Sequence, residues 1–202
     1  MPFTSYNNLA MVVKTFELTY RENDFILESE FTLNDYFKQR FEIIFKEGVV
    51  DNSKAAICEN IISPILTEIW LSYKENWLLW SHQTLIYNED LSGLTDYLLA
   101  QKSPLGKIVF DKPFFVAIKA KKDDFTAGWG QCGAEMLACQ KINGETEGKS
   151  IFGIVSNGKI WEFAKLSDRF FTKNIQPYTI YDLEKLFRAV NYVFEQCQLQ
   201  IN

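Results

Sequence analysis

The sequence contains few of the residues that build metal clusters or disulfide frameworks. Its 202 residues include one histidine, His82, and four cysteines that lie singly, without a Cys-x-x-Cys pair. A zinc site made of thiolates and imidazoles is therefore excluded. We expect the cysteines to be reduced thiols in the core, as in a cytoplasmic protein. They are Cys58, Cys132, Cys139 and Cys197.

Long hydrophobic runs and an excess of positive charge are also missing. No apolar stretch approaches the roughly 20 residues that span a membrane. The polar segment Met1 to Asn8 lacks the basic start and apolar run of a signal peptide, so we expect no membrane contact. The net charge is −5, so any contact with nucleic acid must use a local basic patch rather than a general positive field.

Apolar and aromatic residues, in contrast, are plentiful. At 47% hydrophobic and 15% aromatic residues, the chain has enough apolar surface to form a sizeable core without metal or disulfide links. No repeat, low-complexity tract or linker divides it. We therefore expect a single domain over residues 1–202.

Hydrophobic spacing predicts several helices and strands. Residues 10–30 are predicted only as a strand or as an irregular segment that covers the core. Pro64 is expected to bend the helix predicted from Ser53 to Ile69. Helical spacing covers Leu33 to Phe45, Ser53 to Ile69, Trp129 to Lys141 and Asp182 to Gln198. Strands are predicted at Trp77 to Tyr87, Leu94 to Ala100, Ile108 to Lys119, Ile151 to Val155 and Ile160 to Phe163. The order predicts a mixed α/β fold (α+β, with a mixed sheet), beginning with an antiparallel meander.

Two short segments between the predicted helices and strands have the composition of a turn and of a loop. Asn157-Gly158 between two apolar runs is a strong hairpin signal. A polar loop is expected between Asn143 and Ser150.

A carboxylate and two lysines stand out within the predicted strands. Asp96 lies on one apolar strand, and the triplet Lys119-Ala120-Lys121 ends the next. Since side chains alternate across a strand, Lys119 and Lys121 share a face, where both can meet Asp96. A carboxylate beside a strand-end lysine suits a divalent-metal phosphodiesterase, because the carboxylate holds the cation and the lysine positions water or phosphate.

The pattern resembles the PD-(D/E)XK nuclease superfamily, which has the restriction-endonuclease-like fold, and is most similar to small cyanobacterial-type members. The matching segments are Thr95-Asp96-Tyr97, Lys119-Ala120-Lys121, Asp123-Asp124-Phe125 and Gly128-Trp129-Gly130-Gln131. The resemblance covers roughly Ser53 to Leu166. It implies a core of order α-β-β-β-α-β at 53–166, an N-terminal extension at 1–52, a β-hairpin extension, and a C-terminal helical extension at 167–202.

The resemblance also implies roles for individual residues. Asp96 would be the first metal ligand, Lys121 the catalytic lysine, and Gln131 the helix residue that faces the site. The cofactor would be Mg²⁺ or Mn²⁺, and the activity that of a DNA endonuclease. Relatives of this fold often form homodimers, for which exposed aromatic residues between Phe163 and Tyr181 are available.

The sequence departs from the family pattern at two positions. Thr95 replaces a proline, and Lys119 replaces the second acid of the motif. A unit charge ~4 Å from a divalent ion contributes about 8 kcal/mol at an effective dielectric constant of ~20, so a lysine there removes most of the metal affinity. Glu135, four residues after Gln131 on the same helix face, is the candidate second metal ligand beside Asp96.

Other residues have two interpretations each. Glu59, on the helix before the strands, is a further accessory acid or part of a solvated helix edge. Trp129 is a packing anchor, which the flanking glycines favour, or a base-stacking group. Asp96 is a metal ligand or a strand-end residue that accepts hydrogen bonds in a turn.

The sequence is compatible with two functions. One is a metal-dependent endonuclease that uses Asp96, Lys121 and Glu135. The other is a non-catalytic binding or structural module, in which Lys119, Lys121 and Lys122 contact phosphate or an acidic protein partner. By itself, the run of lysines and acids near residue 121 is also compatible with a solvated charge cluster.

Overall fold

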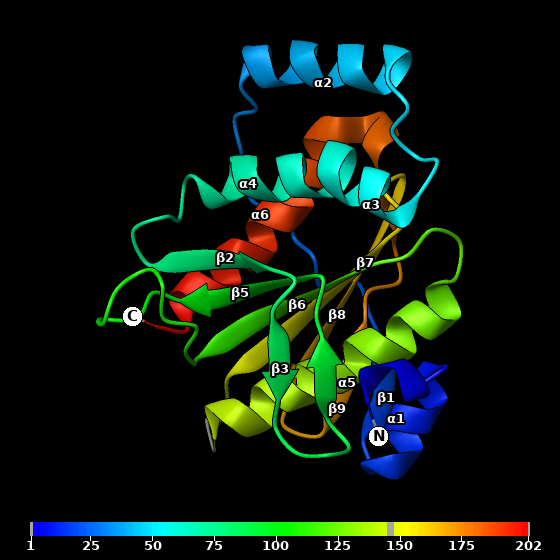
Figure 1. Ribbon diagram of the computed structural model, residues 1–202, viewed down its shortest axis with the longest axis vertical. Helices are drawn as coiled ribbons and strands as arrows, with labels where there is room; N and C mark the ends of the chain where they lie inside the picture. The colour runs from blue at the N-terminus through cyan, green and yellow to red at the C-terminus, as the bar shows by residue number, and fades with distance from the viewer. Residues whose placement is uncertain (1, 145–147, 202) are drawn as a thin grey trace.

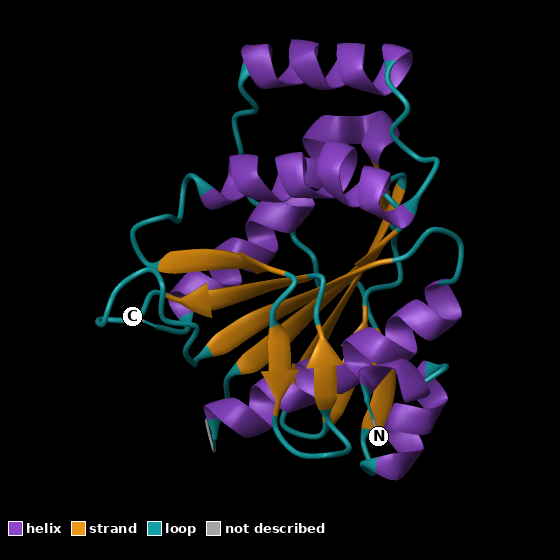
Figure 2. Ribbon diagram, in the orientation of Figure 1, coloured by secondary structure: helices purple, strands orange, loops and turns teal. Residues whose placement is uncertain are grey.

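The computed structural model describes residues 2–144 and 148–201. A twisted eight-stranded sheet lies between two layers of helices, with α1 (Leu9–Thr15) and α5 (Phe125–Asn143) on one face (Figures 1 and 2). The other face is covered by α4 (Ser63–Trp70) and α6 (Leu183–Leu199), with α2 (Asp35–Glu47) outside them. The predicted mixed α/β fold is confirmed.

The sheet has the strand order β1-β9-β8-β7-β6-β5-β2, with β10 paired to β8. The pairs β6/β7 and β1/β9 are parallel, and the others are antiparallel. A separate small sheet consists of β3 (Thr84–Ile86) and β4 (Ser92–Leu94). The strands of the large sheet are β1 (Thr19–Glu22), β2 (Trp77–Ser81), β5 (Tyr97–Gln101), β6 (Phe114–Ala120), β7 (Ser150–Ser156), β8 (Ile160–Ser167), β9 (Phe170–Lys173) and β10 (Tyr178–Thr179).

Two hydrophobic cores lie on either side of this sheet. One packs α4 and α6 against the sheet, and the other packs α1 and α5 against the opposite face. All four cysteines are buried free thiols, as predicted. Among the described residues, no helix combines the length and apolar character that crossing a bilayer requires.

Most predicted helices are present with shifted ends. The segment after Ser53 forms α3 (Lys54–Ile57), the π-helical turn η2 (Cys58–Ile62) and then α4. Pro64 is the second residue of α4 and follows this turn. Proline has no N–H to donate to the preceding helical turn, so the regular α-helical hydrogen bonding is interrupted at this point. The remaining short elements are the 3-10 helices η1 (Phe3–Ser5) and η3 (Ile180–Asp182).

The hairpin at Asn157-Gly158 is confirmed between β7 and β8. Gly158 has a φ of 86°, a conformation that favours glycine, and the Asn157 side chain accepts hydrogen bonds from the backbone of Lys159 and Ile160. The predicted loop after Asn143 includes residues 145–147, which lie outside the described residues.

Several predicted boundaries were wrong. Helix α5 begins at Phe125 rather than at Trp129, since the Asp124 side chain accepts a hydrogen bond from the Ala127 N–H and caps the helix there. The strand expected from Ile108 begins only at Phe114, and Ile108 is exposed in the preceding loop.

The N-terminal residues are an integral part of the fold. Residues 10–30 include α1, which was not predicted, and the edge strand β1, which pairs with β9. Gly130 lies so close to this segment that a Cβ there would be 2.2 Å from the Tyr6 carbonyl oxygen. The backbone of α5 at this glycine is therefore packed directly against the N-terminal segment.

The aromatic residues expected to be exposed near the C-terminus are mostly buried. Phe163, Phe171 and Tyr178 belong to the cores, whereas Tyr181 is 75% exposed. Phe163 and Tyr178 pack into the core on the α4 and α6 side of the sheet and Phe171 into the core on the α5 side, whereas Phe170 on β9 is 37% exposed.

Candidate functional site

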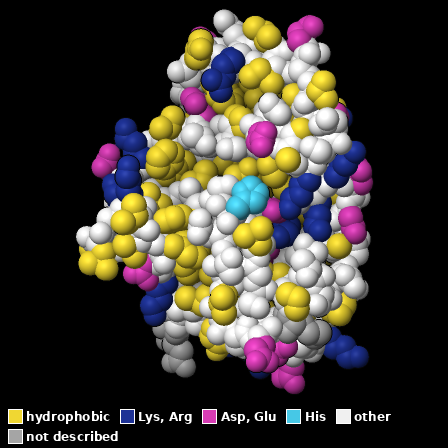
Figure 3. All heavy atoms as spheres, in the orientation of Figure 1, with side chains coloured by type: hydrophobic (Ala, Val, Ile, Leu, Met, Phe, Trp, Pro, Cys, Tyr) yellow, Lys and Arg dark blue, Asp and Glu magenta, His cyan; other side chains and the backbone are white. Residues whose placement is uncertain are grey.

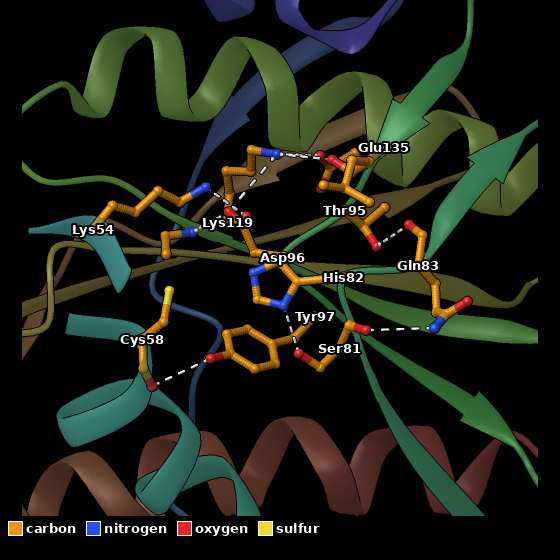
Figure 4. A network of polar contacts seen from close by, with 12 residues as sticks. Lys54, Cys58, Ser81, His82, Gln83, Thr95, Asp96, Tyr97, Lys119 and Glu135 are labelled. Atoms are coloured by element: carbon orange, nitrogen blue, oxygen red, sulfur yellow. Dashed lines mark hydrogen bonds and ion pairs between the residues drawn. The ribbon is translucent and has the colours of Figure 1, made fainter. Parts of the chain in front are cut away.

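The site is built at a bend in two neighbouring strands. The sequence predicted one long strand from Trp77 and another carrying Asp96. Both are interrupted, the first between Ser81 and Thr84 and the second between Leu94 and Tyr97. His82, with a φ of 52°, separates β2 from β3, and its N–H donates to the Asp96 carbonyl oxygen at 2.9 Å. Asp96 therefore lies at the bend, one residue before β5, rather than within a strand (Figure 4).

Thr95 helps to form this bend. Its N–H and its hydroxyl both donate to the carbonyl oxygen of Gln83, at 3.0 and 2.9 Å. A proline at this position would lack both donors. The threonine at this position thus has a local structural role.

The carboxylate of Asp96 is buried and fully engaged. Its Oδ2 accepts the backbone N–H of Ala120 at 2.8 Å, which links the bend to the end of β6. Its Oδ1 accepts from the Lys54 ammonium at 2.5 Å, and the side chain is only 3% exposed. At the bend, Asp96 thus combines a backbone hydrogen bond with an ion pair to Lys54.

Lys119 connects Asp96 to Glu135. Its Nζ lies 2.8 Å from Glu135 Oε1 and 3.8 Å from Asp96 Oδ2, and it also donates to the Leu94 carbonyl oxygen at 3.4 Å. The lysine side chain is 6% exposed and the glutamate side chain is fully buried. The predicted approach of Glu135 to Asp96 is thus present, but an ammonium lies between the two acids (Figure 4).

The protonation of this pair follows from its burial. Burial alone would lower the pKa of Lys119, but the Glu135 and Asp96 carboxylates together raise it above its ordinary value. Burial raises the pKa of Glu135 to about 7, against the opposing effect of the Lys119 ammonium. Lys119 is therefore a permanent cation at neutral pH.

Lys54 reaches the site from the start of α3. The Ser53 side chain caps this helix by accepting the Ala56 N–H at 3.1 Å. The Tyr97 hydroxyl donates to the Cys58 carbonyl oxygen at 3.2 Å and ties the π-helical turn to β5. Nothing in the sequence indicated that Lys54 would pair with a residue 42 positions away.

Lys121 follows the end of β6 on the same face as Lys119, as side-chain alternation predicted. Its side chain is half-buried against α5, where a Cβ on Gly128 would lie 3.1 Å from the Lys121 Cγ. Burial lowers the pKa of Lys121, and the ammonium groups of Lys119 and Lys54 lower it further. Because Asp96 also acts on this pKa, these charges share one electrostatic environment.

The remaining predicted residues are less closely connected to this cluster. Gln131 is buried one turn before Glu135, but in the described part of the chain no hydrogen bond joins its side chain to Asp96 or Lys121. Glu59 is exposed, in agreement with a solvated helix edge. Lys122 is exposed and donates to the Asn52 carbonyl oxygen at 3.3 Å.

Trp129 is a packing residue. It is 4% exposed, its ring meets Phe171 edge to face at a centroid distance of 6.0 Å, and its Nε1 donates to Glu162 at 2.5 Å. The indole therefore presents no free face for a base. Of the two interpretations from the sequence, packing is the one that the structure bears out.

The donors at this site do not fit a divalent metal. Within residues 2–144 and 148–201, no three His, Cys, Asp or Glu side chains are grouped for metal binding. The two acids near each other, Asp96 and Glu135, already share the ammonium of Lys119, and Lys54 neutralises Asp96 as well. A magnesium ion between them would lie against a fixed positive charge.

Comparison of the sequence with protein-family models and with curated proteins gave no match in either case.

Proposed function

We propose that this chain is a nuclease-fold protein of the PD-(D/E)XK type that binds the phosphodiester backbone of DNA without cleaving it. The observation that carries the proposal is the place of Lys119, whose ammonium lies 2.8 Å from Glu135 and 3.8 Å from Asp96. Hydrolysis in this superfamily requires a divalent ion held by such acids. Here the acids are occupied by a lysine.

The family assignment is supported by the order of the elements and by their motifs. The segment from α3 to β7 supplies helix, β2, β5, β6, α5 and β7 in succession, with the β3/β4 hairpin inserted. The Asp96 bend, the end of β6 and the buried face of α5 converge, as the motif residues require.

DNA binding is supported by three lysines at the mouth of the site, which we term the basic rim. Lys54 and Lys122 keep exposed side chains, and Lys121 is half-buried against α5. Figure 3 shows Lys and Arg side chains gathered beside the single histidine on this face. A rim of this kind attracts phosphate locally, although the chain as a whole carries a net charge of −5.

The test is DNA binding measured by fluorescence anisotropy in EDTA at low salt, with single- and double-stranded probes. We expect wild type to bind and the Lys121→Ala/Lys122→Ala variant to bind at least about tenfold more weakly, because two phosphate contacts are lost. The variant Lys14→Ala/Lys46→Ala removes the same charge from α1 and α2 and serves as the matched control. Equal losses in both variants would exclude the basic rim.

A cleavage assay with Mg²⁺ and Mn²⁺ tests the second half of the proposal. We expect no cleavage of either probe by the wild-type protein. Cleavage that disappears in Asp96→Asn would show that the chain is an active endonuclease, and the non-catalytic proposal would then be wrong.

A further inference from the structure

A groove on the α1 side of the sheet lies apart from the cluster of Asp96, Lys119 and Glu135, and shares no residue with it. Its walls come from α1, from the first half of α5, which packs against α1, and from the edge strand β1 (Figure 1). The groove has a volume of about 440 Å³. This volume lies within the range of sites at which proteins bind small molecules.

Most of the groove is apolar. Leu9 and Val13 lie one turn apart on α1 and line it together with Phe125, the first residue of α5. All three side chains are only partly buried. Because removing such apolar surface from water is favourable, the groove fits a ligand with an apolar body.

Two opposite charges lie at the polar end of the groove. Glu162 on β8 and Lys173 on β9 are the charged side chains among the described residues that line it, and they pair at a distance of 2.9 Å. Their side chains remain 23% and 26% exposed. Both charges are therefore accessible to a ligand that enters the groove.

The protein leaves part of the hydrogen-bonding capacity of this pair unused. Glu162 Oε2 accepts from the Trp129 indole N–H at 2.5 Å and also pairs with Lys173. Within the described residues, no hydrogen bond or ion pair engages the other oxygen, Oε1. The Lys173 ammonium carries three N–H donors, and its further contact is with the Trp129 ring, whose centroid lies 5.5 Å from Nζ. One carboxylate oxygen and the remaining N–H donors are thus available at the groove.

We propose that this groove binds a free amino acid with a large apolar side chain. The carboxylate of the ligand pairs with Lys173, its ammonium group pairs with Glu162, and its side chain covers Leu9, Val13 and Phe125. A single carbon separates the two charges of an amino acid, which suits the close spacing of Glu162 and Lys173. A simple acid or amine would satisfy one of these charges and meet repulsion from the other. The inference does not depend on the proposed binding of DNA.

The experiment measures binding to the full chain by isothermal titration calorimetry, with L-phenylalanine and L-leucine as probes. We expect one-to-one binding of at least one probe with a Kd of about 1 mM or below. Phenylalaninamide lacks the carboxylate, phenylpropionate lacks the ammonium, and glycine lacks the apolar side chain. Each of the three should bind at least about tenfold more weakly than the better probe. The proposal is overturned by no binding of either probe at about 10 mM, or by equal binding of any of the three analogues.

Variants on two walls of the groove locate the ligand. Ala10 lines the groove from an exposed position on α1, so Ala10→Trp should fill the groove and abolish binding without disturbing the core. Lys173→Met should weaken binding at least about tenfold, because the partner of the carboxylate is lost. The matched control is Lys165→Met, since Lys165 is a half-buried lysine of β8 whose Nζ lies 4.8 Å from the centroid of the Phe25 ring, in the opposite core.

Binding should be unchanged in the control variant. Unchanged binding in Ala10→Trp, or equal losses in the two lysine variants, would contradict the proposal. The analogue series uses the wild-type protein, so it decides the proposal even where a variant fails to fold. Circular dichroism in the far ultraviolet identifies such a variant.

Discussion

Lys119 on β6 and Glu135 on α5 form a buried ion pair with an Nζ to Oε1 distance of 2.8 Å. The pair joins β6, an interior strand of the sheet, to the helix that covers it, and both side chains are at least nine-tenths buried. Such a pair is costly to break because the remaining charge has neither water nor a partner. The pair should therefore contribute to the free energy of unfolding whatever the activity of the protein.

Removing one partner should destabilise the protein more than removing both. We expect Lys119→Met to lower the free energy of unfolding by about 3–5 kcal/mol at pH 8, since Glu135 is left buried as an uncompensated anion. The double variant Lys119→Met/Glu135→Leu should recover most of this loss, because two apolar groups then replace the charges. Urea denaturation measures all three proteins. A double variant less stable than Lys119→Met would contradict this account.

The stability of the protein should depend on pH through Glu135. Its pKa is raised from 4.5 to about 7 in the folded state, so the folded protein keeps a proton that the unfolded chain releases. The free energy of unfolding should therefore fall as pH rises from about 4.5 to about 7, by roughly 3 kcal/mol at most. In Glu135→Gln this dependence should disappear from denaturation curves recorded over the same range. An unchanged pH profile in the variant would assign the effect to other groups.

Gly130 should tolerate no side chain. A Cβ there would lie 2.2 Å from the Tyr6 carbonyl oxygen and 2.6 Å from the Asn8 backbone nitrogen. Since backbone atoms must move to relieve these contacts, we expect Gly130→Ala to cost about 3 kcal/mol of stability or more. Thr126→Ala, at an exposed position of the same helix, should change stability by less than about 0.5 kcal/mol. Similar thermal unfolding of the two variants would show that the N-terminal segment is not held tightly against α5.

The proposed binding of DNA through the basic rim should depend on salt concentration in a defined way. Lys122→Ala removes one exposed cation. We expect the slope of log binding constant against log salt concentration to decrease by about one, without a change in sequence preference. Anisotropy titrations at several salt concentrations measure the slope, with Lys46→Ala as the control. An unchanged slope would place Lys122 outside the contact surface.

The hydrogen bond between Tyr97 and the π-helical turn should stabilise the fold. Tyr97→Phe removes the hydrogen bond from its hydroxyl to the Cys58 carbonyl oxygen, and we expect a loss of about 1 kcal/mol in the free energy of unfolding. Tyr36→Phe changes an exposed tyrosine on α2 and should have no comparable effect. Chemical denaturation of both variants decides whether this contact contributes to stability.

Much of the architecture was predictable from local patterns. Apolar spacing located α2, α4, α5 and α6, and Asn157-Gly158 located the β7/β8 hairpin. These features depend on periodicity and turn chemistry within a few residues, which a sequence displays directly. The break of both long strands at His82 and Asp96 was not visible, since it depends on hydrogen bonds between two segments.

By itself, the sequence determined the mixed α/β class, the buried thiols and the shared face of Lys119 and Lys121. Only the tertiary structure decided that the Lys119 ammonium would lie between Asp96 and Glu135, and that Lys54 would join them from another helix. The physical reason is that alternation along a strand fixes the direction of a side chain but not its partners. Partners are set by the packing of α3, β6 and α5 around a buried carboxylate, over separations of 16 to 42 residues.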